Sequence, residues 1–364
     1  MSAHEIILAV MALFAAAGAV DRVFGGRLGL GQGFEEGILS MGALALSMAG
    51  IICLAPVLAA VLRPVIAPVY RVLGADPAMF AGTILANDTG GAALAMELAQ
   101  TREAGLLGGV LAGSMLGATV VFSIPVALGL LEEADRPALA KGVLAGIVAI
   151  PLGVLAGGLT AGFSLGMILR NLTPIVLIAL LIALGLWRLE GGMIRGFALF
   201  GRLVIAVTTL GLAAALVEAV TGFSLLPGMA PASEAIETVG QIALVLAGAF
   251  PLVHVLTRLL RRPLGAVGRR LGVNDTAAAG FLASMANSIA MFGMVKEMDR
   301  RGKVLNIAFS VCAAFVFGDH LGFTAGFAPE MLVPVIVGKL TGGVAAVAVA
   351  MWLTKGEAHG QECA

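Results

Sequence analysis

The chain is a succession of apolar segments, most of which are long enough to cross a lipid bilayer as helices. A spanning helix needs about 20 apolar residues. Only 12% of the residues are charged, whereas soluble domains carry about 25%. We therefore expect an all-α, polytopic membrane protein that forms a single domain over residues 1–364. The segments cover about 4–20, 37–62, 78–98, 103–131, 139–161, 165–187, 196–220, 236–260, 276–296, 303–326 and 331–353.

The first segment, 4–20, has the length of a signal-peptide core and ends in small residues. A signal peptide begins with a basic region, and no Lys or Arg precedes this segment, which holds His4 and Glu5 instead. We interpret it as a short first span that is retained.

Polar residues interrupt two of the segments near their centres. Segment 78–98 contains Asn87-Asp88-Thr89-Gly90-Gly91, and segment 276–296 contains Asn287-Ser288. An unpaired polar group at membrane depth costs several kcal/mol, so a pair of such clusters indicates the two halves of a substrate site. Each segment is either a re-entrant helical hairpin or one broken spanning helix.

The basic residues around segment 276–296 favour the hairpin. Arg269 and Arg270 precede it, and Arg300 and Lys303 follow it. Lys and Arg concentrate on the cytoplasmic side of a membrane, and only a re-entrant segment places both groups there. This predicts about nine transmembrane helices plus two re-entrant hairpins, with the N-terminus outside and the C-terminus cytoplasmic. Eleven spanning helices are the alternative.

The two halves of the chain also resemble each other. Residues Gly42–Gly50 align with Gly240–Gly248, and the asparagines Asn87 and Asn287 occupy matching places. The offset stays near 198–200 residues. Runs of Ala, Gly and Leu align easily, but matching asparagines do not follow from composition alone.

We therefore expect two internal repeats, about 1–161 and 196–353, joined by a linker helix over 165–187. If both hairpins are re-entrant, an odd number of crossings separates the starts of the two repeats, so the repeats are inverted. One hairpin then enters from each face, and their tips meet near the membrane midplane.

Four strings in the chain are distinctive. They are Phe34-Glu35-Glu36-Gly37, Val121-Phe122-Ser123-Ile124-Pro125-Val126-Ala127-Leu128-Gly129, Met291-Phe292-Gly293-Met294 and Gly318-Asp319-His320-Leu321-Gly322-Phe323. These strings closely resemble the ethanolamine utilization transporter family, and the likeness runs in the same order from about residue 5 to residue 353. It implies an inner-membrane protein that carries ethanolamine into bacteria, where it feeds the cobalamin-dependent ethanolamine ammonia-lyase.

The chain departs from the family pattern at three positions in the hairpins. In the family a second Asn and a Pro often occupy the positions of Ser288 and Ala290, and a Cys often occupies that of Asn87. These departures leave the hairpin contacts with the substrate open.

Ethanolamine at neutral pH is a small ammonium ion with a hydroxyl group. It calls for a carboxylate or an aromatic face for the cation and a neutral polar group for the hydroxyl. Intramembrane carboxylates indicate function by default, which makes Asp88 the first candidate and Asp319 the second. The alternatives are a helix cap for Asp88 and a structural hydrogen bond between Asp319 and His320.

The other candidates supply neutral polar or aromatic groups. They hold the substrate, or they cap half-helices and pack in the core. The full set of expected substrate-binding residues is Asn87, Asp88, Thr89, Asn287, Ser288, Asp319, His320, Phe122 and Phe317.

No pattern in the chain indicates catalysis or a cofactor. A phosphate-binding Walker loop, GxGxxG, HExxH and a Ser-His-Asp arrangement are all missing from a usable context, and the zero net charge gives no nucleic-acid footprint. We expect no enzyme activity, no cofactor and no metal. The expected partners are ethanolamine and the lipid bilayer. A homo-oligomer, another small amine or polar solute, a channel, and coupling to a proton or ion all stay open.

Overall fold

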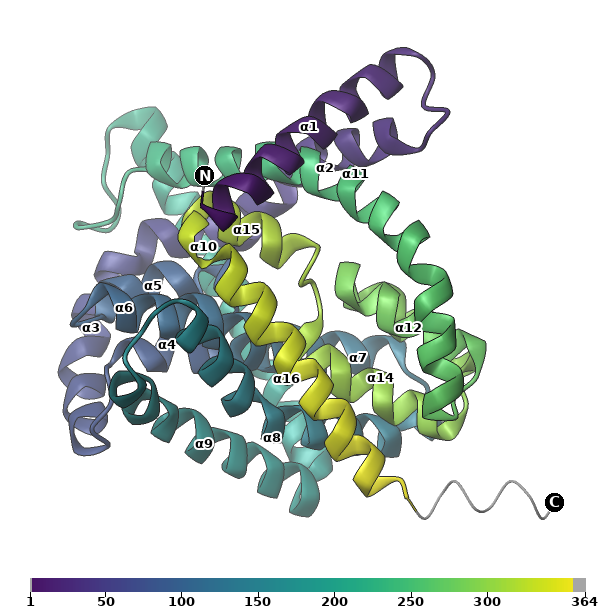
Figure 1. The fold of residues 1–364 in the computed structure, drawn as a ribbon. Helices are drawn as coiled ribbons and strands as arrows, with labels where there is room; N and C mark the ends of the chain where they lie inside the picture. The colour runs from purple at the N-terminus through teal and green to yellow at the C-terminus, as the bar shows by residue number, and fades with distance from the viewer. Residues whose placement is uncertain (1, 356–364) are drawn as a thin grey trace.

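The computed structural model describes residues 2–355, and every regular element within them is a helix (Figure 1). The elements are α1 (Ala3–Val23), α2 (Leu30–Leu44), η1 (Ala45–Ala49), α3 (Gly50–Val72), α4 (Ala78–Ile84), η2 (Asn87–Thr89), α5 (Gly91–Leu98), α6 (Arg102–Gly105), η3 (Leu106–Gly117), η4 (Thr119–Ser123), α7 (Ile124–Leu130), η5 (Glu133–Asp135), α8 (Arg136–Thr160), α9 (Leu165–Arg188), α10 (Glu190–Thr221), α11 (Ala232–Leu271), α12 (Asp275–Ala286), α13 (Ser288–Met294), η6 (Val295–Glu297), α14 (Arg300–Ala313), α15 (Asp319–Phe327), η7 (Pro329–Met331) and α16 (Leu332–Leu353).

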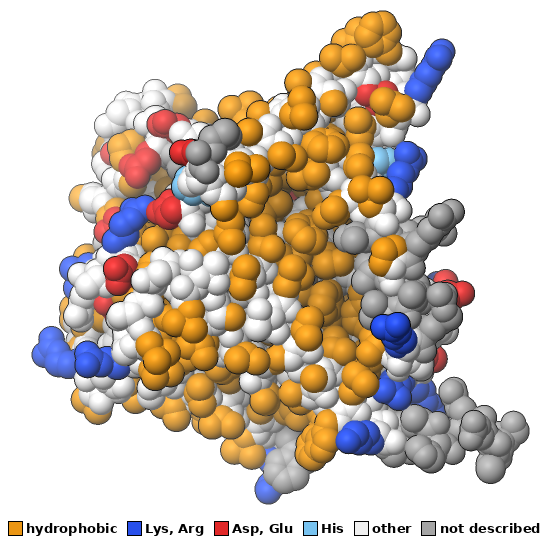
Figure 2. All heavy atoms as spheres, viewed as in Figure 1, with side chains coloured by type: hydrophobic (Ala, Val, Ile, Leu, Met, Phe, Trp, Pro, Cys, Tyr) orange, Lys and Arg blue, Asp and Glu red, His pale blue; other side chains and the backbone are white. Residues whose placement is uncertain are grey.

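Eight helical stretches of the described chain are long and apolar enough to cross a membrane. Large apolar side chains lie on the surface, for example Leu13, Leu181 and Leu210, each more than 60% exposed. Figure 2 shows hydrophobic side chains over the middle of one face and charged side chains at its margins. A soluble monomer rarely exposes such a surface, so this is a multi-pass membrane protein. The eight stretches are Ala3–Val23, Leu30–Val72, Arg102–Leu130, Glu133–Thr160, Leu165–Gly185, Gly191–Thr221, Ala232–Leu259 and Pro329–Leu353.

The expected continuous span over 303–326 is wrong. The chain forms α14, leaves helical geometry over residues 314–318, and resumes as α15. Phe315 has a positive φ of 61°, the only such non-glycine residue described. Asp319, which the sequence places late in a continuous helix, is therefore the first residue of a half-helix.

Hydrogen bonds join the two ends of each interrupted segment. At the first, the Asp76 carboxylate accepts from the backbone N–H of Gln100 at 3.0 Å. At the second, the Asp299 carboxylate accepts from the backbone N–H of Asn274 at 2.9 Å. Segments 78–98 and 276–296 therefore begin and end at the same place. We name them hairpin 1 and hairpin 2.

Helices α8 and α16 pack closely as an antiparallel pair. Gly153 and Gly157 of α8 face Gly338 and Pro334 of α16, so the backbones approach closely. An ion pair lies at each end of this pair. Arg102 pairs with Glu330 before the start of α16, and Lys303 pairs with Asp135 before the start of α8. Since α8 has 25 residues, the two ion pairs lie about 37 Å apart along its axis.

Hairpin 1 packs against the helical stretch Arg102–Leu130, much of which is wound as π-helix. A side chain at Gly117 would overlap the carbonyl oxygen of Leu85, and one at Gly82 would overlap that of Gly108. Glycine at these positions lets the break of hairpin 1 reach the buried middle of the bundle.

Candidate functional site

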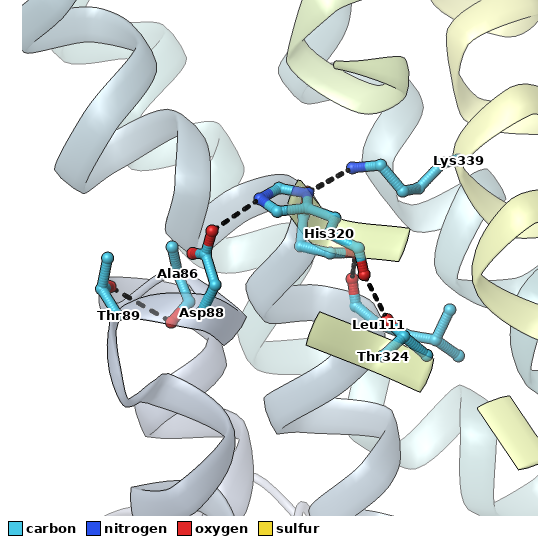
Figure 3. Close-up of polar contacts among 8 residues, drawn as sticks. Ala86, Asp88, Thr89, Leu111, His320, Thr324 and Lys339 are labelled. Atoms are coloured by element: carbon cyan, nitrogen blue, oxygen red, sulfur yellow. Dashed lines mark hydrogen bonds and ion pairs between the residues drawn. The ribbon is translucent and has the colours of Figure 1, made fainter. Parts of the chain in front are cut away.

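The break in hairpin 1 places Asp88 on a short turn inside the protein. Leu85 and Ala86 have extended backbone, and Gly90 takes a left-handed φ of 87°. The Thr89 hydroxyl donates to the carbonyl of Ala86 at 3.2 Å, so Thr89 stabilises the turn itself. The turn directs the Asp88 carboxylate toward α15 (Figure 3).

The break in hairpin 2 is completed by the break between α14 and α15. The N–H groups of Phe315 and Phe317 donate to the carbonyls of Ser284 and Met285 at 3.1 and 3.0 Å. These carbonyls end α12 and would otherwise lack a helical partner. The two breaks thus satisfy each other's backbone groups deep in the protein.

Asn287 caps the second half of hairpin 2. Its side-chain oxygen accepts from the N–H of Ile289 at 2.8 Å, as the capping alternative expects. Asn287 also borders a cavity of about 400 Å³, so capping and facing a ligand are compatible.

This cavity lies between α2, α11, the break of hairpin 2 and the start of α15. Its lining includes Phe250 and His254 of α11, and Asn287, Phe317 and Asp319 from the two breaks and the start of α15. From α2, Gln32 and Glu36 add polar groups that are hydrogen-bonded to each other at 2.8 Å. The site is small, polar and acidic, with two aromatic rings.

Asp319 is the carboxylate that lacks a partner in this cavity. Among the described residues, no hydrogen bond or ion pair reaches its side chain. A largely buried carboxylate without a partner is costly, so the position suits a cation.

A second set of polar side chains, formed by Asp88, His320 and Lys339, begins at the residue that follows Asp319. His320 is 3% exposed and Lys339 is 1% exposed. The His320 Nε2 atom lies 3.7 Å from the Asp88 Oδ2 atom, and its Nδ1 atom lies 3.1 Å from the Lys339 Nζ atom. Lys339 also donates to the carbonyl of Ser114 at 2.6 Å. Figure 3 shows the three side chains in line.

Hydrogen-bond chemistry restricts the protons in this chain of groups. An ammonium group only donates, so a charged Lys339 requires Nδ1 of His320 to accept. The neutral imidazole then carries its proton on Nε2, which faces Asp88. At 3.7 Å the contact between Nε2 of His320 and Oδ2 of Asp88 is longer than a hydrogen bond, and with a neutral imidazole it is not an ion pair.

The alternative of a structural hydrogen bond between Asp319 and His320 is not realised among the described residues. The two residues are consecutive at the start of α15, but Asp319 lines the cavity while His320 joins Asp88 and Lys339. Successive residues on a helix do not face one another, which explains the divergence.

Several buried polar side chains near the breaks have no protein partner. Asn87, Ser284 and Ser288 are each 0% exposed, and their side-chain polar atoms make no hydrogen bond to any residue that the structure describes. Buried polar groups are nearly always paired. The two hairpin tips therefore retain free capacity for hydrogen bonding, and Asn87 and Ser288 stay candidates for substrate contact.

The two candidate phenylalanines occupy different places. Phe317 lines the cavity. Phe122 packs edge-on against Phe315, with ring centroids 5.6 Å apart, and Phe315 in turn lies 5.1 Å from His320. Phe122 thus supports Phe315, which in turn packs against His320 of the buried group formed by Asp88, His320 and Lys339.

Lys339 is the site residue that sequence reasoning missed. A signal for it exists, because it is the single ionisable residue inside the apolar segment 331–353, and such residues indicate function. No three His, Cys, Asp or Glu side chains within residues 2–355 lie close enough together to hold a metal ion.

The family profile and the most similar named proteins point to the same family. The profile of the family described as "Ethanolamine utilisation protein, EutH" matches residues 3–353. A protein of Listeria monocytogenes named "Probable ethanolamine permease EutH" is 58% identical over 97% of this chain and 95% of its own length. The protein of that name from Escherichia coli is 50% identical over 98% of this chain and 97% of its own length. No solved structure matches the chain.

Proposed function

Since this chain belongs to the EutH family of ethanolamine utilisation proteins, we propose that it transports ethanolamine across the bacterial inner membrane. Its relatives are named as probable ethanolamine permeases, and the helices that could cross a membrane fit such a carrier. We propose transport without catalysis.

The unpartnered Asp319 carboxylate in the small cavity supports this function most directly. A carboxylate attracts the ammonium group, and the ring of Phe317 offers a second favourable surface for it. Asn287, on the same cavity, is suited to the hydroxyl. The breaks that meet here resemble the half-helix sites of secondary transporters, where a substrate binds near the midplane.

Uptake of labelled ethanolamine into liposomes that contain the purified protein tests the function. Protein-dependent uptake above that of empty liposomes is expected at slightly acidic pH, where the amine is protonated. Acceleration by unlabelled ethanolamine inside the liposomes would identify a carrier and exclude a channel. Uptake equal to that of empty liposomes would contradict the proposal.

We propose that the two repeats are inverted, as the sequence predicts. The ion pairs support this relation. Arg102 follows hairpin 1 and pairs with Glu330 in the second half, whereas Lys303 follows hairpin 2 and pairs with Asp135 in the first half. A two-fold relation between the halves generates such reciprocal contacts.

Cysteine labelling will test the membrane topology. Exposed positions on the two sides of hairpin 2, Arg270→Cys and Lys296→Cys, are both expected to lie on the cytoplasmic face. In a protein without Cys53, Cys312 and Cys363, both should react with a membrane-impermeant thiol reagent only after permeabilisation. Gln100→Cys, beside hairpin 1, serves as the control for the opposite face and should react in intact cells. Reaction of only one of the hairpin 2 positions in intact cells would mean that the segment spans the membrane.

The aromatic wall yields a prediction about substrate affinity. Replacing Phe317 by Leu is expected to raise the KM for ethanolamine about thirtyfold, because a desolvated cation–π contact contributes about 2 kcal/mol. Phe122→Leu is the matched control and should leave KM within about twofold, since Phe122 packs against Phe315 outside the cavity. Equal effects of the two changes would remove the cation–π role.

A further inference from the structure

We propose that the protein exchanges one ethanolamine ammonium ion for one proton, and that Lys339 fixes this ratio by neutralising Asp88 through His320. The inference rests on the proposed transport of ethanolamine and adds how that transport is coupled.

Two contacts with the protein fix the position of the Lys339 ammonium group in the site. It lies within α16, is 1% exposed, and contacts the Ser114 carbonyl and His320 Nδ1. Through the imidazole it faces Asp88, whose carboxylate lies 3.7 Å from His320 Nε2. A buried ammonium with fixed partners acts as a built-in cation that occupies one carboxylate.

The charges at this place can be counted. Asp88 contacts His320, which directly follows Asp319 at the start of α15, so the two carboxylates belong to one site. With the carboxylates ionised, Lys339 charged and His320 neutral, the empty site carries one net negative charge. A bound ethanolamine ammonium brings the sum to zero.

The remaining neighbours of Lys339 leave this sum unchanged. From α14, Cys312 contributes a neutral thiol, which is buried and donates to the carbonyl of Gly146. From η3 the contact is a backbone carbonyl, and from α8 glycine faces the preceding residue Gly338. Among the described residues, the ionisable neighbours of Lys339 are Asp88, His320 and Cys312. Two further ionisable residues, Glu36 and His254, line the cavity together with Asp319. Glu36 is exposed and accepts a hydrogen bond from the side chain of Gln32, so water screens its charge, and His254 is counted as neutral.

The empty site must bind a cation before it can switch from facing one side of the membrane to facing the other. An uncompensated charge in a low-dielectric interior is unfavourable, and a proton on the free Asp319 carboxylate removes it. When ethanolamine ammonium arrives, the O–H bond of Asp319 breaks, the proton leaves to water, and the ammonium takes its place. Both forms that cross are neutral, so the exchange moves no net charge.

The test measures how membrane potential and pH gradient act on protein-dependent uptake into liposomes, after subtraction of empty liposomes. For the wild-type protein, an inside-acid gradient should accelerate uptake several-fold. An inside-negative potential, set with potassium and valinomycin, should leave the initial rate within about twofold. A pH-sensitive dye inside the liposomes should report proton loss as ethanolamine enters.

Three variants test whether the net charge of the site, and not a loss of folding, determines how uptake responds to the membrane potential. In Asp88→Asn the empty site is neutral and returns without a proton. Its uptake should therefore follow the potential, and about 100 mV should change the accumulation ratio about fiftyfold. In Lys339→Met the empty site carries two negative charges, and uptake should fall at least tenfold. The double variant Asp88→Asn/Lys339→Met again carries one negative charge and should regain uptake that is insensitive to potential. Lys355→Met, an exposed lysine beyond α16, is the control and should match wild type.

Each result decides the proposal. Wild-type uptake that follows the potential and ignores the pH gradient overturns the exchange, while ethanolamine transport itself would stand. A folded double variant no more active than Lys339→Met overturns the role of Lys339, and so does an Asp88→Asn protein that ignores the potential. Absence of any protein-dependent uptake by the wild type would instead contradict the proposed function.

Discussion

Replacing Asp319 by Asn is expected to raise the KM for ethanolamine about a hundredfold or more. The carboxylate lines the cavity and has no partner of its own among the described residues, so we assign it the ammonium group of the substrate. Removing one member of a buried charge pair costs about 3–5 kcal/mol, and each 1.4 kcal/mol is a tenfold change in affinity. Asparagine keeps the shape of the side chain, and therefore the fold.

The measurement is the concentration dependence of ethanolamine uptake by liposomes with equal amounts of folded protein. Asp275→Asn is a suitable control, because Asp275 is exposed at the start of hairpin 2 and should leave KM unchanged. A KM for Asp319→Asn within about threefold of wild type would exclude Asp319 as the partner of the cation.

Replacing Gly318 by Ala is expected to abolish most of the uptake by separating the two breaks. A methyl group at this position would overlap the carbonyl oxygen of Ala286 at the end of α12, and neither backbone can yield without breaking the hydrogen bonds from Phe315 and Phe317. Overpacking of this kind costs about 1–3 kcal/mol, so we expect a drop in uptake of about fivefold to a hundredfold.

Gly293→Ala provides the matched control on hairpin 2, since a methyl group there meets no atom within 4 Å. Protein yield, thermal stability and uptake are compared for the two variants. Gly318→Ala should lower all three, or uptake alone if the protein relaxes locally. Wild-type uptake by Gly318→Ala would show that contact between the breaks is not needed for transport.

The sequence predicts the interrupted hairpins but not the third break. In the hairpins, Asn87 and Asn287 mark the breaks because polar residues stand in apolar surroundings. Residues 314–317 are Ala-Phe-Val-Phe, which read as the middle of a continuous helix. Their backbone leaves the helix because it pairs with α12, and a partner from another part of the chain has no local signal.

The candidate site, like the fold, can be predicted from the sequence only in part. The residue types at Asp88, Asp319 and His320 indicate chemistry at membrane depth, and the structure brings all three to the start of α15. The pairing itself depends on which way each side chain leaves the helix, and on Lys339, which lies 19 residues after His320 on another helix. Composition and spacing contain no information on such contacts.

The pairing between α12 and residues 315–317 also has a consequence for how the protein enters the membrane. The carbonyls of Ser284 and Met285 accept hydrogen bonds from N–H groups that the ribosome adds some thirty residues later. Until then the end of α12 presents unpaired carbonyls, and a helix of 12 residues is too short to cross the bilayer. We therefore expect hairpin 2 to enter the lipid phase only after the ribosome has added α14 and the start of α15, so that this part of the chain leaves the translocation machinery as a unit and not helix by helix.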